Sequence, residues 1–214
     1  MASLPTLPRK YHQASIWLLY AIGLVPAAWG FWLGATGRLP GNPVKEFEHL
    51  LGLWALRFLV ATLAVTPLRD LFSINWIRYR RALGLLAFWY VLMHFLTYML
   101  LDQYLDFSAV LADIAKRPFI TIGMTGFVLL IPLALTSNVW SIRRLGARWV
   151  KLHRLVYVIA AAGALHFAMS VKVVGPEPWT YIVLVAVLLM WRPVRPRFNR
   201  WKRGSDGRAQ FHRA

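Results

Sequence analysis

Residues 82–101 read ALGLLAFWYVLMHFLTYMLL, an unbroken apolar stretch with a single histidine, His94, beyond its middle. A helix needs about 20 mainly apolar residues to cross the hydrocarbon core of a bilayer. Five further stretches have this length or approach it: 15–35, 49–67, 118–137, 153–171 and 178–191. They are continuously apolar and lack the alternation of a membrane strand. The sequence therefore predicts an all-α polytopic membrane protein, a bundle of six transmembrane helices.

The composition of the chain excludes several other classes of protein. Of its 214 residues, 58% are hydrophobic and 15% are charged, whereas about 25% are charged in a soluble domain. In a soluble protein, the net charge of +17 would suggest nucleic-acid binding. So apolar a chain cannot form the wet surface that this function needs. The absence of cysteine excludes disulfides, iron–sulfur clusters and thiolate zinc sites.

The distribution of lysine and arginine predicts the orientation. With the N-terminus in the cytoplasm, 19 of the 25 basic residues lie inside and five outside, and Arg57 lies within a span. Cytoplasmic loops carry such an excess of positive charge. We therefore expect a cytoplasmic N-terminus at 1–14, a transmembrane domain at 15–192 with an uncleaved first span, and a basic cytoplasmic tail at 193–214. The tail is expected to anchor to lipid headgroups or to dock a soluble partner.

Two histidines lie inside predicted spans, where ionisable residues are rare and often functional. His94 belongs to the third span and His166 to the fifth. At ~1.5 Å per residue, both lie ~20 Å from the basic residues at the inner ends of their spans. Two neutral imidazoles at one depth can ligate a haem iron from its two faces, and Gly163 and Gly84 leave room for a flat group beside them. The alternative is a hydrogen bond from each histidine to a neighbouring helix.

His153 is a third candidate ligand, near the inner end of the fifth span. A haem there needs a partner on the third span, but about four helical turns before His94 the chain carries Arg80, which cannot ligate iron. His153 is thus predicted to bind a second haem in another way, to serve a different cofactor, or to be a polar interfacial residue.

Three arginines are candidate cofactor contacts. Arg80 and Arg81 open the third span at the depth of His153, where they could hold a phosphate or a haem propionate, although they could also serve only to fix the topology. Arg57 lies within the second span, and a mid-span arginine needs an anionic partner or water. A cofactor anion would satisfy Arg57, and snorkelling to the interface is the alternative.

Several segments together resemble the MsrQ family, formerly YedZ. They are LRFLVATLAVTPLRD at 56–70, RYRRALGLLAFWYVLMH at 78–94, KRPFITIGMTG at 116–126, LALTSNVWSIRRLGARWVKLHRLVYV at 133–158, and ALHF at 164–167. The family provides the haem-binding membrane subunit of a bacterial methionine sulfoxide reductase system, within the ferric-reductase-like transmembrane superfamily. The resemblance implies a six-helix core of that type, with b-type haem held by histidines at positions 94, 166 and 153.

The resemblance also implies a function. The chain would pass electrons through the bacterial inner membrane to a periplasmic molybdopterin enzyme that reduces oxidised methionines in envelope proteins. Quinone is an implied electron donor, and FMN with a cytosolic flavin reductase is another. The acidic outer residues Asp102, Asp106 and Asp113 are a candidate docking site for the periplasmic enzyme, or simply a solvated loop.

The sequence departs from the larger relatives, since only a short tail follows the last span and no flavin and nicotinamide domain is expected. With Arg80 in place of a second histidine on the third span, we predict one haem on the outer side, between His94 and His166, although two are not excluded. The inner site near Arg80, Arg81 and His153 is then available to flavin or quinone. No catalytic residue is predicted, because such a subunit carries electrons and the chemistry belongs to its partner. The competing hypothesis is a small transporter or assembly protein whose histidines carry protons or a metal ion.

Overall fold

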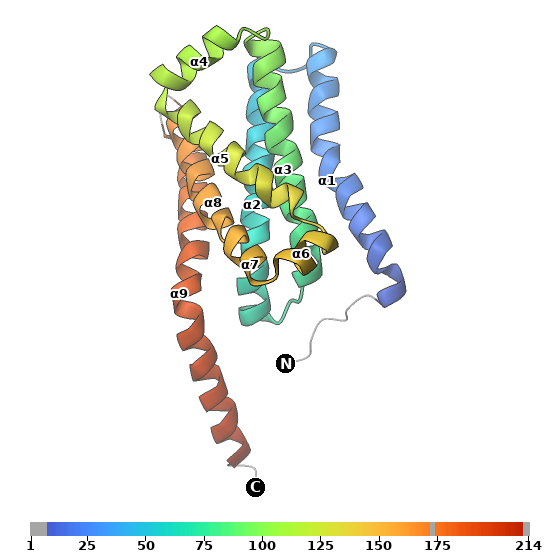
Figure 1. The fold of residues 1–214 in the computed structure, drawn as a ribbon, viewed down its shortest axis with the longest axis vertical. Helices are drawn as coiled ribbons and strands as arrows, with labels where there is room; N and C mark the ends of the chain where they lie inside the picture. The colour runs from blue at the N-terminus through green and yellow to red at the C-terminus, as the bar shows by residue number, and fades with distance from the viewer. Residues whose placement is uncertain (1–7, 172–173, 212–214) are drawn as a thin grey trace.

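Long helices run between two ends of the molecule and form an all-α bundle (Figure 1). The computed structural model describes residues 8–171 and 174–211, with side chains as far as Trp201 except that of Arg9. Lys172 and Arg213, both counted among the basic residues above, lie outside these ranges. In chain order the helices are α1 (His12–Ala35), α2 (Pro43–Phe72), α3 (Arg80–Thr97), α4 (Phe107–Lys116), α5 (Pro118–Leu135), α6 (Val139–Leu145), α7 (Ala147–His153), α8 (Leu155–Ser170) and α9 (Pro176–Phe211).

The predicted class of fold is confirmed. The described ranges contain helices and no strands, and five helical segments are long and apolar enough to cross a membrane: 12–35, 43–72, 77–102, 118–135 and 147–170. The sixth predicted span, 178–191, lies within α9. It covers only about 21 Å at 1.5 Å per residue, less than the ~30 Å hydrocarbon core. The helix itself continues through Pro193 and Pro196 to Phe211, into the predicted tail.

The helix of the second span begins earlier than predicted, at Pro43, because its first turn is capped. The side chain of Asn42 accepts hydrogen bonds from the backbone N–H groups of Val44 and Lys45, at 3.0 and 3.2 Å, and Pro43 occupies the first helical position. These residues satisfy or remove amide donors that would otherwise be free at a helix start. The helix therefore begins at 43 and carries Lys45 and Glu48 on its own first turns.

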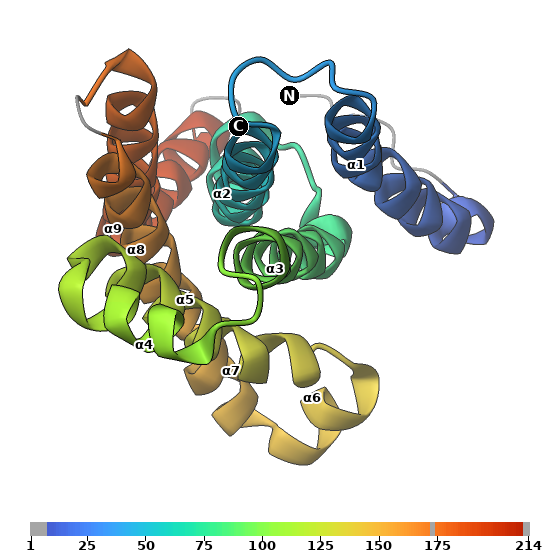
Figure 2. The ribbon, with the colours of Figure 1, turned by 90° about the horizontal axis from the view of Figure 1, so that it is seen from above.

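The bundle is organised around two packed helix pairs. α2 packs extensively against α3, and α5 against α8, while α9 lies along α8 and α2. Seen from above, α2 and α3 lie at the centre, with α1 on one side and with α5, α8 and α9 on the other (Figure 2). A short turn of π-helix, Tyr98–Asp102, prolongs α3, and the connection that follows carries the short helix α4.

Tyr90 of α3 hydrogen-bonds to the backbone of α1 beside Pro26, the proline that interrupts that helix. Pro26 has no N–H to donate, and its ring disturbs the preceding turn. The buried hydroxyl of Tyr90, on α3, donates to the carbonyl of Gly23 at 2.7 Å and accepts from the N–H of Ala27 at 3.1 Å. In an unbroken helix the carbonyl of Gly23 would accept directly from the N–H of Ala27. Here the Tyr90 hydroxyl bridges these two groups instead. α1 bends partway along its length (Figure 1), as expected for Pro26.

Candidate functional site

A cavity of about 430 Å³ lies among α2, α3, α5 and α8. This volume is in the range of cofactor and ligand sites. Most of its wall is apolar: Leu53, Leu56, Leu59, Val91, Ile120, Phe127, Leu130, Ile159 and Phe167. Its polar lining includes residues from the outer ends of these helices: Lys45, Glu48, His49, Tyr98, Arg117 and Ser170. The cavity therefore lies toward the end of the bundle away from the start of α1 and the end of α9.

His94 and His166 both line this cavity. His94 belongs to α3 and His166 to α8, the helices of the predicted third and fifth spans. Their ring centroids lie 6.2 Å apart and the ring planes are nearly perpendicular, at 85°. The structure thus brings together the two histidines for which the sequence predicted a common ligand.

Each imidazole donates its Nδ1 proton to a backbone carbonyl of a neighbouring helix. His94 Nδ1 lies 2.8 Å from the carbonyl oxygen of Glu48 on α2, and His166 Nδ1 lies 2.7 Å from that of Phe119 on α5. A carbonyl can only accept, so in both rings Nδ1 carries the proton and Nε2 carries the lone pair. Neither Nε2 has a hydrogen-bond partner within the described part of the chain, and both rings border the cavity.

This arrangement fits an iron atom bonded between the two rings. Imidazole nitrogen binds metals at about 2 Å, as in zinc sites, so one metal bonded to both rings would place the centroids about 6 Å apart. The observed separation is 6.2 Å. The wall is apolar enough to accept a macrocycle and Gly163 is part of it. Gly84, in contrast, is not among the residues that line the cavity.

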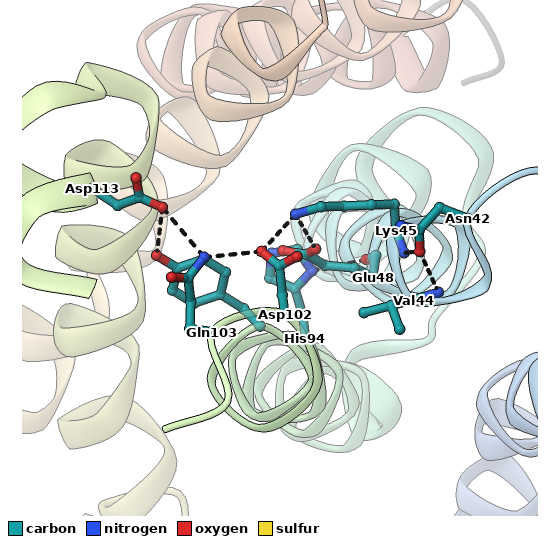
Figure 3. Close-up of polar contacts among 9 residues, drawn as sticks. Asn42, Val44, Lys45, Glu48, His94, Asp102, Gln103 and Asp113 are labelled. Carbon is teal, nitrogen blue, oxygen red and sulfur yellow. Dashed lines mark hydrogen bonds and ion pairs between the residues drawn. The ribbon is translucent and has the colours of Figure 1, made fainter. Parts of the chain in front are cut away.

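Two of the three outer acidic residues, Asp102 and Asp113, belong to one chain of polar contacts, because Gln103 Nε2 lies 3.1 Å from Asp102 and 3.5 Å from Asp113 (Figure 3). Lys45 Nζ lies 2.6 Å from Asp102 and 3.4 Å from Glu48. Asp113 accepts from Tyr98 at 3.1 Å and pairs with Arg117 at 3.2 Å. Asp106 instead caps α4, accepting from the N–H of Ala109 at 3.0 Å. All three acidic residues proposed for docking therefore have partners within the chain, and two of them pair with cations that line the cavity.

His153 lies apart from the histidine pair and does not line the cavity. Its ring stacks on Trp149 at a centroid distance of 3.8 Å, and its Nδ1 donates to the Trp149 carbonyl at 3.1 Å. Its Nε2 is 3.5 Å from Ser137 Oγ. The positive charge of Arg80 is close enough to act on His153. Arg81 is exposed, and its charge acts on Tyr20 of α1.

Arg57 has partners that the sequence did not reveal. Its Nε donates to the Tyr181 hydroxyl at 2.9 Å, and its Nη2 lies 3.8 Å from Glu177. Both partners belong to α9, and the guanidinium also lies over the ring of Trp54 at 4.8 Å. Arg57 does not line the cavity. Its position within a span thus has an explanation in the chain itself, without a cofactor anion.

Sequence reasoning missed the cavity rim and the two carbonyl acceptors. The sequence indicated no role for Lys45 and Arg117 beyond their outer charge. It also did not single out His49, whose ring borders the cavity and lies 5.6 Å from that of Phe167. The acceptors at Glu48 and Phe119 are backbone groups, which every residue carries, so no residue type marks them. For Lys45 and Arg117, the useful signal was their place beside the outer ends of the spans that surround the histidines.

Comparison with known proteins identifies relatives of this chain. Residues 51–164 match the family described as ferric reductase like transmembrane component. The chain is 75% identical over 203 residues to the protein-methionine-sulfoxide reductase heme-binding subunit MsrQ of Rhizobium meliloti (strain 1021), covering 95% of this chain and 94% of the relative. It is 63% identical to the subunit of the same name from Brucella anthropi over 195 residues, 91% of this chain and 89% of the relative. No solved structure matches the chain.

Proposed function

The chain belongs to the MsrQ heme-binding subunits of the ferric-reductase-like transmembrane family, and from this membership we propose that it is a b-type cytochrome that passes electrons across the bacterial inner membrane. Its role is haem-dependent electron transfer within a methionine sulfoxide reductase system. The receiving partner in this proposal is a periplasmic molybdopterin-dependent reductase that repairs oxidised methionines in envelope proteins. The electrons come from quinol, or from a flavin donor such as FMN with a cytosolic flavin reductase.

The observation that carries this proposal is the pair His94 and His166, with both Nε2 atoms free beside one apolar cavity. A haem held there would supply a one-electron carrier. The two histidines would hold its iron through Nε2, and the largely apolar wall would limit the access of water to it. Lys45 and Arg117 at the rim are suited to the propionates, because cations bind carboxylates through charge-assisted hydrogen bonds.

The position of the cavity supports delivery of electrons to the outer side. Its polar lining includes residues beside the outer connections, whereas the start of α1, α6 and α7 lie at the opposite end of the bundle (Figure 1). That opposite end carries most of the basic residues, so the positive-inside rule assigns it to the cytoplasm. With this orientation both termini are cytoplasmic, the basic end of α9 projects beyond the rest of the bundle on the cytoplasmic side (Figure 1), and the haem lies near the periplasm.

The inner end offers a second site, which we assign to flavin or quinone near Arg80, Arg81 and His153. The indole Nε1 of Trp191 and the Nη2 of Arg192 are buried donors without an acceptor in the described residues. The charge of Arg192 also interacts with that of Arg80. Buried donors without acceptors are costly, and an anionic or carbonyl ligand would satisfy them.

Absorption spectroscopy tests the haem proposal. Protein purified from cells supplied with ample haem is expected to show a Soret band that shifts on reduction with dithionite. His94→Ala and His166→Ala should each lose this band, while His12→Ala, which removes a histidine outside the cavity, should retain it. A colourless wild-type preparation would contradict the proposal and favour a transporter or assembly protein.

The inner-site proposal has a separate test. Flavin content and the rate of haem reduction by a flavin donor or quinol are measured in the double variant Arg80→Ala, Arg81→Ala. Both quantities should fall relative to wild type. The control is Arg143→Ala with Arg144→Ala, which removes the same charge from the same side. Unchanged values in the Arg80, Arg81 double variant would rule the inner site out.

A further inference from the structure

Both histidines rest against a glycine of a neighbouring helix. The ring of His94, on α3, lies against Gly52 of α2. A Cβ atom built on Gly52 would lie 3.3 Å from both Nδ1 and Cε1 of that ring, tighter than ordinary van der Waals contact. The carbonyl that accepts the His94 proton belongs to Glu48, four residues before Gly52.

The second histidine repeats the arrangement on the other helix pair. The ring of His166, on α8, lies against Gly123 of α5. A Cβ atom there would lie only 2.8 Å from Nδ1 and from Cε1, so the ring could not keep its place. The accepting carbonyl belongs to Phe119, which again precedes the glycine by four residues.

The spacing of four has a structural reason. In an α-helix the carbonyl oxygen of residue i accepts a hydrogen bond from the N–H of residue i+4. Its second lone pair stays available to accept another hydrogen bond. The Cβ of residue i+4 normally flanks this carbonyl. Glycine at i+4 removes that Cβ and opens a notch, through which an imidazole can reach the oxygen. The notch over Glu48 and Gly52 and the notch over Phe119 and Gly123 are equivalent in this respect.

We propose that Gly52 and Gly123 are positioning residues for the haem ligands, each holding one imidazole in its notch so that Nδ1–H bonds to the helix and Nε2 faces the iron. The inference rests on the proposed haem site between His94 and His166. It assigns to these two glycines, which line the cavity, an indirect control of ligand tautomer, ring orientation and donor strength.

The notch affects the iron electronically as well as sterically. A ligand histidine that donates its other ring proton to a carbonyl becomes more basic at the coordinating nitrogen. A stronger donor stabilises ferric over ferrous iron and lowers the reduction potential. Losing one notch should therefore raise the potential of the haem and make that ligand easier to displace by carbon monoxide.

The two contacts predict an order of effects. A methyl group added at Gly123 would lie 2.8 Å from the His166 ring, which would have to leave its place. A methyl group added at Gly52 would lie 3.3 Å from the His94 ring, which would have to shift by only a few tenths of an ångström. Gly123→Ala should thus shift the potential upward more than Gly52→Ala does. Gly84→Ala is the matched control, since it adds the same methyl group to α3, with no heavy atom closer than 4.0 Å to the new Cβ.

The experiment compares purified wild type, Gly52→Ala, Gly123→Ala and Gly84→Ala, each loaded with b-type haem. Three quantities are measured: haem per chain, midpoint potential, and the fraction of ferrous protein that binds carbon monoxide. In Gly123→Ala we expect an upward shift in potential and a several-fold rise in carbon monoxide binding. Gly52→Ala should show smaller changes in the same direction, and Gly84→Ala should match wild type.

Potentials and carbon monoxide binding that are unchanged in both Gly52→Ala and Gly123→Ala would overturn the inference. Should Gly123→Ala not elute as a folded species, Gly52→Ala decides by the same readouts. Failure of the underlying haem site would be recognised differently, because wild type itself would then bind no haem, or His166→Ala would keep the wild-type spectrum.

Discussion

Replacing Tyr90 by phenylalanine removes one hydroxyl that bonds two backbone groups of α1. That hydroxyl donates to the Gly23 carbonyl at 2.7 Å and accepts from the Ala27 N–H at 3.1 Å. The side chain is fully buried, with 0% of its surface exposed, so no water can substitute for it. Because Pro26 lies between the two groups, the helix cannot easily rejoin them directly.

The expected cost follows from these two bonds. Interhelical hydrogen bonds in membrane proteins contribute about 0.6 kcal/mol on average and up to about 1.7, and leaving a buried group unpaired costs about 1–3 kcal/mol. Two well-formed bonds to backbone groups thus give about 2 kcal/mol for Tyr90→Phe. A loss of this size changes the unfolding equilibrium about 30-fold.

The assay is equilibrium unfolding of the purified protein in mixed micelles, followed by circular dichroism as the fraction of denaturing detergent rises. The control is Tyr104→Phe, which removes the same hydroxyl from a side chain that is 82% exposed and should cost almost nothing. If Tyr90→Phe unfolds at the same point as Tyr104→Phe, the hydroxyl does not hold the interrupted helix and the reasoning is refuted.

Three further variants test the remaining contacts. Arg57→Gln should lower stability by less than about 1 kcal/mol, because half-exposed ion pairs contribute little. It should leave haem content unchanged, since Arg57 lies outside the cavity, and a loss of haem would show a cofactor contact. Asp70→Asn removes a carboxylate that pairs with Arg195 at 2.6 Å and Arg69 at 3.2 Å. It should lower the free energy of unfolding by about 1–3 kcal/mol and make α9 more sensitive to limited proteolysis. Unchanged cleavage would argue against a link between α2 and α9 through Asp70. His153→Ala should keep the wild-type haem content, and a halved content would instead indicate a second haem at His153.

The spans and the histidine pair could be predicted because they depend on properties that each residue carries by itself. Apolar length defines a membrane helix, and the distance of His94 and His166 from the inner basic residues gives their depth. Helix ends depend on smaller details. The capping of α2 by Asn42 moved the start of that helix and placed Lys45 over the cavity.

Contacts between distant segments could not be predicted from a single sequence. Glu177 and Tyr181 approach Arg57 from α9, more than a hundred residues away along the chain. The carbonyls that accept from the histidines belong to the backbone, so no residue type marks them in the sequence. The role of a glycine within a span likewise becomes clear only when the structure shows an imidazole packed against it. These details of the site therefore required the tertiary structure.

The haem-to-protein ratio of the purified wild type tests the central claim most directly. Haem is quantified as its pyridine haemochrome, and protein by amino-acid analysis. A single site between His94 and His166 predicts one b-type haem per chain. A ratio near zero after expression with ample haem would contradict the electron-transfer account, and a ratio of two would contradict the single-site assignment.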